Sequence, residues 1–538
     1  MIPFDPYRHK YPSQRNIVYA KNGMVCSTQP LASQIGLEAL KKGGNAMDAA
    51  VAVASALPLL EPTCNGIGAD AFALIWTEGK LYGINGSGPA PKALTPEAVK
   101  ARGYEAMPVT GWCSVTVPGA PACWGAVHKR FGCLPLSDIM APVIRYAREG
   151  FPVQAHLKGM WEMEKEKIAK AAASDPAPYE AWFTTFLKDG HIPEPGEIFR
   201  CPDMADTLEE LAATECESFY RGSLAEKILA HSQATGGFLT REDLADYQAE
   251  WVEPLSVSYK GYDVYEMPPN GHGLTVLMAL NILKTMDLGN ERENEEAYHK
   301  TIEALKLAFV DAQKYVTDPR FMSVDPKDLL KEDYAAKRRS LVGEEALFPS
   351  AGVPNGSDTV YFCTADGEGN MVSFIQSNAK HFGSGIVVQG TGISLQDRAV
   401  NFSLDPSHDN CLQGGKKTYH TIIPGFLAKD GRPIGPFGVM GGFMQPQGHV
   451  QVLVNTIDFH MNPQEALDAP RFQWVGGKKI QFEHGIEDYL SKALQRRGHE
   501  IEIVAENRNM GRGQIIWTDG TVLVGGTESR ADGCIAAY

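Results

Sequence analysis

The pattern of the sequence changes after Pro349, and this change constrains the fold more than any other feature. Before it, apolar residues recur at helical spacing, and residues 134–235 in particular are mostly helical in pattern. The segment SAGVPNGSD (350–358) is small, polar and turn-forming, which is typical of a loop or linker. The next segment, TVYFCTADGEGNMVSFIQS (359–377), predicts two strands joined by a turn at residues 366–369. A helix-rich first two-thirds and a strand-rich last third predict an α+β fold in which helices cover stacked sheets.

Two segments of the N-terminal part have patterns that identify their structure. Residues 46–60, AMDAAVAVASALPLL, are nearly all apolar and predict a helix that is buried on every side. The preceding helical pattern, which starts at Leu31, is expected to end at Gly43-Gly44, because glycine suits the C-terminus of a helix. Residues 71–86, AFALIWTEGKLYGING, form two apolar runs around a Glu-Gly turn and predict a β-hairpin.

Length and charge exclude several classes of function. The chain has 538 residues, which predicts two to four domains. Its net charge of −15 argues against a nucleic-acid partner, which would need a basic surface to neutralise phosphates. No apolar run reaches the roughly 18 residues of a membrane-spanning helix, and the N-terminus lacks the apolar stretch of a secretory signal. We therefore expect a cytoplasmic protein with no membrane partner.

The cysteines and histidines show no metal-binding pattern. The ten cysteines are scattered, without a C-x-x-C pair or paired histidines at ligand spacing. Free thiols in a reducing compartment are the expectation, and disulfides are the alternative. His272, in PPNGHG, fits a turn, and His299, His408 and His449 lack the spacing of metal ligands. The sequence therefore predicts neither a metal nor another cofactor.

A set of motifs runs through the chain in a fixed order. The N-terminal part contains LASQIGLEALKKGGNAMDAAVA, EPTCNGIGADAF, VTVPGAPACWGAVHKRFG and MPPNGHG. The C-terminal part contains residues 356–395, KKTYHTIIPGFLAKDG, VMGGFMQPQGHVQVLVNTIDFHMNPQEALDAPRF and RADG. A single GGNA or MGG would be weak evidence. The ordered set covers almost the whole chain and closely resembles the gamma-glutamyltransferase family.

The resemblance implies a fold and a self-cleaving chemistry. The implied fold is the four-layer αββα sandwich of N-terminal-nucleophile hydrolases, with Thr359 at the inner end of a central strand. Cleavage between Asp358 and Thr359 would give a large subunit, residues 1–358, and a small subunit, residues 359–538, which stay together as a heterodimer. Thr359 would then be the nucleophile, and its α-amine, with a reference pKa near ~7.7–8.0, the general base. From the residues alone, Thr359 is only a β-branched residue that opens a strand.

The resemblance also implies further catalytic residues. Ser377 falls where the family has a threonine whose hydroxyl bonds the nucleophile. Gly441-Gly442 matches the glycine pair whose backbone N–H groups stabilise the oxyanion, and glycine allows the close approach that this needs. Asn378 is a further candidate donor. The alternatives are an ordinary strand serine at 377 and a turn at a strand end for the glycine pair.

The substrate-binding positions depart from those of gamma-glutamyltransferases. The expected carboxylate-binding arginine reads as Ser87, the two ammonium-binding positions read as Arg398 and Asn401, and a serine pair reads as His420-Thr421. An arginine repels an ammonium group but binds a carboxylate well. A solvated surface residue is the alternative for Arg398.

These departures predict the substrate class. The chain is expected to be an amidohydrolase or acyltransferase that acts on a small carboxylate-bearing amide, like the acylases and the oxamate amidohydrolase of the family, with Arg398 and His420 as carboxylate ligands. One alternative is a conventional gamma-glutamyltransferase or glutathione hydrolase. The other is an unprocessed relative that only binds, and the retention of Thr359, Ser377 and the glycine pair argues against it. Whether the paired subunits assemble further into homo-oligomers is left open by the sequence.

Overall fold

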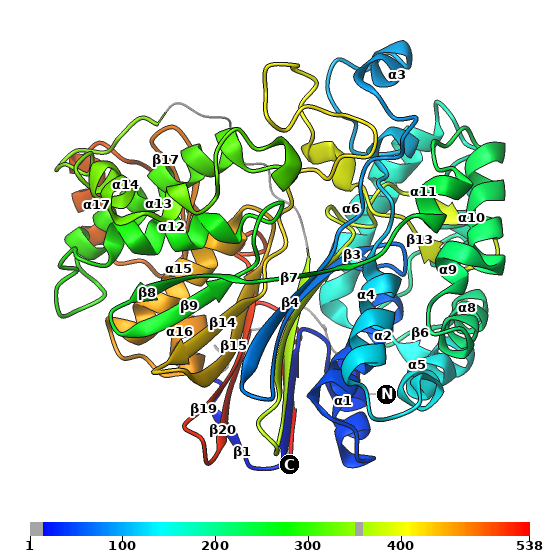
Figure 1. Ribbon diagram of the computed structural model, residues 1–538, viewed down its shortest axis with the longest axis horizontal. Coiled ribbons are helices and arrows are strands. Elements are labelled where there is room, and N and C mark those ends of the chain that lie inside the picture. Colours follow the sequence, from blue (N-terminus) through cyan, green and yellow to red (C-terminus); the bar gives the residue numbers. More distant parts are fainter. Residues whose placement is uncertain (1–13, 350–358) are drawn as a thin grey trace.

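Two seven-stranded sheets form the centre of the computed structural model, which describes residues 14–349 and 359–538 (Figure 1). The first sheet has the order β1 (Val18–Ala20), β20 (Leu523–Thr527), β19 (Arg512–Thr518), β15 (Arg432–Met440), β14 (Gly425–Lys429), β9 (Tyr262–Glu266) and β8 (Leu255–Tyr259). The second sheet has the order β21 (Cys534–Ala537), β2 (Gly23–Ser27), β10 (Val360–Asp366), β11 (Met371–Ser377), β3 (Asp70–Thr77), β4 (Lys80–Gly86) and β7 (Glu250–Val252). Neighbouring strands in both sheets are antiparallel.

The two sheets pack face to face, and a layer of helices covers the outer face of each (Figure 1). The first sheet is covered by α12 (Gly273–Leu283), α13 (Glu295–Tyr315), α14 (Glu332–Arg339), α15 (Met444–Ile457), α16 (Pro463–Asp468) and α17 (Asp488–Arg496). The second sheet is covered by α1 (Pro30–Lys41), α2 (Ala46–Leu60), α4 (Ala120–Phe131) and α5 (Leu136–Glu149). The predicted four-layer αββα sandwich is therefore confirmed.

The remaining elements extend this frame. Further helices lie outside the second sheet: α6 (Ala155–Ala172), α7 (Glu180–Phe186), α8 (Pro202–Ala213), α9 (Ser218–Arg221), α10 (Ser223–Ala234) and α11 (Arg241–Ala245), with α3 (Pro96–Ala101) at one end. Small sheets are formed by β16 (Phe472–Gly476), β17 (Lys479–Glu483) and β18 (Glu500–Val504), by β12 (Val387–Val388) and β13 (Ile393–Ser394), and by β5 (Phe151–Pro152) and β6 (Ile198–Phe199). Among the residues that the structure describes, no helix is both long and apolar enough to cross a membrane.

Helix α2 shows how local sequence determines a central element. Asn45 caps the helix, because its side-chain oxygen accepts from the N–H groups of Met47 and Asp48. The Asp48 carboxylate accepts in return from the Asn45 N–H, which completes a capping box. Every residue of α2 is buried, as predicted from its apolar composition. The helix packs against α1, α4 and α5 on one side and against β10 and β11 on the other, so it supports the strand that follows Thr359.

The second sheet combines strands from before and after residues 350–358. Strand β10 pairs with β2, and β11 pairs with β3, so the hairpin predicted at 359–377 is inserted between two N-terminal strands. Pairings of this kind bury backbone hydrogen bonds between the two parts of the chain. The two parts therefore contribute strands to the same sheets and apolar side chains to the same buried clusters.

Helix α15 differs from its predicted extent. The segment HVQVLVNTIDFH predicts a helix over residues 449–460, whereas α15 runs from Met444 to Ile457. Pro446 lies in its first turn, where the missing N–H of proline costs no helical hydrogen bond. At the other end His460 has a positive φ of 57°, which ends the helical path. The earlier start places the N-terminus of α15 directly after Gly441-Gly442.

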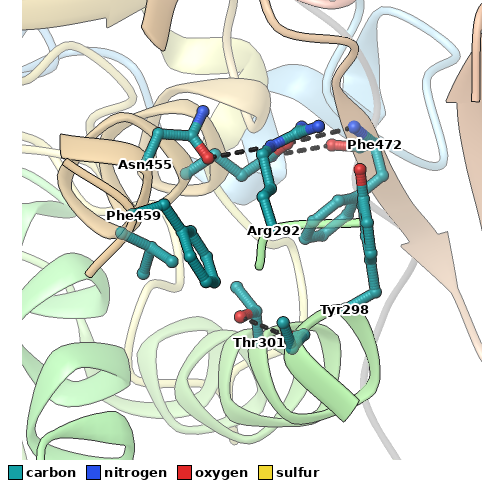
Figure 2. Close-up of a pocket in the computed structure, with 9 residues that line it drawn as sticks. Arg292, Tyr298, Thr301, Asn455, Phe459 and Phe472 are labelled. Atoms are coloured by element: carbon teal, nitrogen blue, oxygen red, sulfur yellow. Dashed lines mark hydrogen bonds between the residues drawn. The ribbon is translucent and has the colours of Figure 1, made fainter. Parts of the chain in front are cut away.

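The two parts of the chain also meet at a small cavity of about 20 Å³ beside α13 and α15 (Figure 2). Arg292 reaches across it, and its Nε donates to the Asn455 side-chain oxygen at 2.9 Å. A terminal nitrogen of Arg292 donates to the Pro470 carbonyl. The cavity has room for about one water molecule and holds none of the predicted site residues. Its importance is therefore structural.

Replacing Arg292 with alanine is expected to lower the free energy of unfolding by about 1–3 kcal/mol, because the buried Asn455 oxygen and the part-buried Pro470 carbonyl lose their donor. Urea unfolding followed by circular dichroism measures this change. The matched control is Arg241→Ala: Arg241 is 68% exposed and pairs with Glu226 at the surface, so its loss should lower the free energy of unfolding far less. Equal effects of the two substitutions would contradict the bridging role of Arg292.

Candidate active site

Thr359 lies at the end of the second sheet, directly before β10. The register pairs Val360 with Gln376, so Thr359 lies opposite Ser377 on the neighbouring strand. The Thr359 Oγ1 donates to the Ser377 Oγ at 3.1 Å, and both residues are buried. The Ser377 Oγ also accepts from the N–H of Ala379 at 2.8 Å. The sheet thus fixes the predicted nucleophile and its hydroxyl partner in direct contact.

The glycine pair 441–442 lies between β15 and the N-terminus of α15. Both residues have positive φ angles, 127° and 57°, which favour glycine. The Gln445 N–H donates to the Gly442 carbonyl at 3.1 Å, and the Gln445 Nε2 donates to the Thr359 Oγ1 at 3.4 Å. Gln445 therefore links the glycine pair to Thr359. The backbone N–H groups at a helix N-terminus suit a developing negative charge.

Asn378, the other candidate donor, follows Ser377 directly. Its backbone N–H donates to the Cys64 carbonyl at 3.2 Å, and its Nδ2 lies 3.4 Å from the Ser394 Oγ. Its side-chain oxygen has no hydrogen-bond partner within residues 14–349 and 359–538, although Asn378 is fully buried. The structure therefore places Asn378 beside the Thr359–Ser377 pair with only a weak bond on its donor group.

Arg398 opens a 3₁₀ turn (Arg398–Asn401) and is fully buried. One terminal nitrogen donates to the Thr421 Oγ1 at 2.7 Å. In the part of the chain that is described, the Nε and the second terminal nitrogen have no hydrogen-bond partner. Burial lowers the pKa of Arg398 to about 10, which leaves the guanidinium charged at neutral pH. The surface alternative for Arg398 is therefore wrong.

Two more of the departing positions, Asn401 and Ser87, make different contacts. Asn401 is half-buried, and its Nδ2 donates to the Tyr419 carbonyl at 3.0 Å. Ser87 is buried, and its hydroxyl donates to the side-chain oxygen of Asn85 at 2.7 Å. Among the predicted substrate ligands, the structure thus brings Arg398 and Thr421 together. The amide of Asn401 instead donates to the backbone.

Asp70 is a buried acid that the sequence analysis missed. It pairs in register with Ser377, on the side of β11 away from Thr359, so the three residues form one row across the sheet. Its Oδ2 lies 3.9 Å from the Arg398 Nε and 3.0 Å from the His420 Nε2. Burial raises the pKa of Asp70 to about 7, although the charge of Arg398 opposes this change.

His420 has a different role from the predicted one. Its Nδ1 accepts from the Ile422 N–H at 3.3 Å, so its Nε2 carries the hydrogen and donates to Asp70. Burial lowers the pKa of His420 well below its usual value, and the charge of Arg398 adds to this effect. A neutral ring with both nitrogens engaged has no donor left for a substrate carboxylate. The expectation that His420 binds substrate is corrected: His420 is a partner of Asp70.

Two signals in the sequence pointed to the missed residues. Asp70 stands inside the apolar run GIGADAF, where an unpaired acid would be costly, so a buried partner could have been expected. Gln445 lies in MGGFMQPQGH, three residues after the glycine pair. Its contact with Thr359 depends on where α15 begins, and the periodic pattern misplaced that point.

A second cluster of titratable residues lies on the outer side of the first sheet. His299, Glu303 and His499 are buried, and their ligand atoms lie within 4.8 Å of one another. The sequence spacing could not show this cluster, because His499 comes from a distant segment. Lys306 donates to Glu303 at 2.7 Å and neutralises its charge. Since a cation already occupies this position, we assign no metal to the cluster.

The chain is similar to known proteins over almost its full length. The family model of gamma-glutamyltranspeptidase matches residues 32–538. The glutathione hydrolase-like YwrD proenzyme of Bacillus subtilis is 38% identical and covers 95% of this chain and 97% of its own. The oxamate amidohydrolase proenzyme of Klebsiella pneumoniae is 32% identical and covers 96% and 98%.

Among solved structures, the cephalosporin acylase from Bacillus halodurans is 57% identical, with a TM-score of 0.96, and it covers 100% of this chain and 99% of its own. The gamma-glutamyltranspeptidase of Helicobacter pylori is 28% identical over 64% of this chain, with a TM-score of 0.55. Family model, relatives and fold agree over almost the full length. The chain therefore belongs to the gamma-glutamyltranspeptidase family of N-terminal-nucleophile hydrolases.

Proposed function

We propose that the chain cuts itself between Asp358 and Thr359 and then hydrolyses an amide bond through an acyl-Thr359 intermediate. The observation that carries the proposal is the buried contact between the Thr359 Oγ1 and the Ser377 Oγ at 3.1 Å, with Gln445 on the same hydroxyl. Asp358 lies outside the described residues. The names of the relatives as proenzymes support a processed chain. The products would be residues 1–358 and 359–538, held together by their shared sheets.

Self-cleavage uses the same hydroxyl as later catalysis. The Thr359 Oγ1 attacks the carbonyl carbon of Asp358, and the C–N bond of that peptide breaks as an ester forms. Water then hydrolyses the ester, which frees the carboxyl group of Asp358 and the α-amine of Thr359. This amine, with a reference pKa near ~7.7–8.0, becomes the base for the next reactions.

In each turnover the α-amine of Thr359 takes the proton of Oγ1 while the oxygen attacks the amide carbon of the substrate. The N–H groups of Gly441 and Gly442, at the N-terminus of α15, stabilise the oxyanion that forms. The proton passes to the departing amine as the C–N bond breaks, and an acyl ester on Thr359 remains. Water, activated by the same α-amine, releases the acid. Ser377 orients the nucleophile throughout.

The substrate is a small amide with a carboxylate on its acyl part. Arg398 supports this choice, because the Nε and one terminal nitrogen of its buried guanidinium can each donate a hydrogen bond to a substrate carboxylate. The oxamate amidohydrolase and cephalosporin acylase names of similar proteins agree with such a substrate. A γ-glutamyl group is a poorer candidate, because its α-ammonium would meet the charge of Arg398.

A panel of p-nitroanilides tests this proposal. Succinyl, glutaryl and adipyl anilides carry a terminal carboxylate, and butanoyl, pentanoyl and hexanoyl anilides are their neutral counterparts of equal length. We expect kcat/KM to favour the carboxylate form by at least about 100-fold, as a pair of charge-assisted hydrogen bonds allows. Hydrolysis of oxamate, measured by the release of ammonia, tests the shortest acyl group that carries a carboxylate. A preference for γ-glutamyl-p-nitroanilide would favour a conventional gamma-glutamyltransferase instead.

A further inference from the structure

Asp70 stands where a carboxylate has no evident use in amide hydrolysis. It lies two strands from Thr359 in the row Thr359–Ser377–Asp70, which corresponds to about 10 Å at the usual strand spacing. It is therefore too far away to act on the nucleophile. Its side chain instead contacts Arg398, the group proposed to bind the substrate carboxylate, and His420.

The contacts of Asp70 determine which nitrogens of the Arg398 guanidinium can still donate to a substrate carboxylate. Thr421 holds one terminal nitrogen at 2.7 Å, and Asp70 lies 3.9 Å from the Nε, which is longer than a hydrogen bond. His420 donates to the Asp70 Oδ2 and keeps that carboxylate from moving closer. The second terminal nitrogen and the Nε keep unpaired N–H groups in the described chain. Asp70 thus orients Arg398 but leaves N–H groups of the guanidinium that can donate to a substrate.

The charge of Asp70 decides how strongly Arg398 can attract a second carboxylate. The titratable groups that face Asp70 are Arg398, Lys417, His420, Tyr220 and Tyr247. Burial keeps both tyrosines and His420 neutral near pH 7, and Lys417 pairs with Glu250 at 2.9 Å. Asp70 is thus the member of this group whose charge changes near neutral pH, since burial raises its pKa to about 7.

We infer that Asp70 is a positioning residue for Arg398 and that its ionisation weakens the binding of carboxylate-bearing substrates. When Asp70 is protonated, Asp397 is the acid that remains near Arg398, and Arg398 keeps more of its positive charge to attract the substrate carboxylate. When Asp70 loses its proton, its negative charge neutralises Arg398 and repels the substrate. Substrate binding and proton binding at Asp70 therefore favour each other. The inference rests on the proposed function, and it names the residue that sets the pH range of substrate binding.

The test is the pH dependence of KM for the carboxyl-bearing p-nitroanilide that the wild-type enzyme hydrolyses fastest. Above pH about 7, KM should rise by up to about tenfold per pH unit, while KM for the neutral anilide of equal length stays flat. Asp70→Asn keeps the bond to His420 and removes the charge. In this variant KM should be flat, equal to wild type near pH 6 and up to about 30-fold lower near pH 8.5. The α-amine of Thr359 acts on kcat, so the two pH profiles are separable.

The matched control is Glu266→Gln. Glu266 is also a buried acid bonded to a histidine, since His449 lies 2.7 Å away, but no arginine of the described residues pairs with it. This variant should keep the wild-type pH profile of KM. A flat KM profile in the wild-type enzyme would overturn the inference whether or not Asp70→Asn folds, and so would a rising profile in Asp70→Asn. Absence of turnover with every anilide would instead contradict the proposed function.

Discussion

Replacing Thr359 with alanine is expected to leave a single uncut chain of 58.6 kDa without amidase activity. The substitution removes the Oγ1 that contacts Ser377 and Gln445, and with it the proposed nucleophile of both cleavage and turnover. Loss of a nucleophile in this type of enzyme lowers kcat by at least about 10⁴-fold. Intact-mass measurement of freshly purified protein and N-terminal sequencing of the fragments check the first part, and the anilide assay checks the second.

The control for this prediction is Thr359→Ser, which keeps a hydroxyl at the same point of the strand. It should still yield two fragments, with serine at the new N-terminus, and it should retain measurable activity. Fragmentation of the alanine variant at the same bond would mean that another group performs the cleavage. A wild-type chain that stays whole after prolonged incubation would favour an unprocessed binding protein.

The elements that local sequence determines were predicted well. Helix α2 follows from its apolar composition and its cap at Asn45, and the β10–β11 hairpin follows from its two apolar runs and the turn at 366–369. The neighbours of these elements are set by contacts distant in sequence. Cys363 of β10, for example, pairs with Cys26 of β2, and no periodic pattern contains that information.

In the site too, local sequence predicts some contacts, and residues distant in sequence decide the others. The contact of Thr359 with Ser377 follows from the register of one hairpin, and the resemblance to a family pointed to both residues. The role of His420 could not be predicted, because it depends on Asp70, a residue of another strand 350 positions earlier in the chain. Side chains that titrate or bind through a distant partner need the folded structure before their function can be stated.

Replacing Arg398 with methionine is expected to lower kcat/KM for a carboxyl-bearing anilide by about 10²- to 10³-fold, because two charge-assisted hydrogen bonds to the substrate are lost. The neutral anilide of equal length makes no such bonds, so its kcat/KM should change far less. The ratio of the two values is the measurement. It separates loss of substrate recognition from a general loss of active enzyme.

The single variant leaves Asp70 without its cationic neighbour, which is costly for a buried acid that ionises. The double variant Arg398→Met, Asp70→Asn removes both charges together and should restore stability without restoring the preference for a carboxylate. This outcome would assign the lost preference to the guanidinium itself. If both anilides lost activity equally in the double variant, Arg398 would serve the architecture of the site, and the carboxylate-binding group would have to be sought elsewhere in the chain.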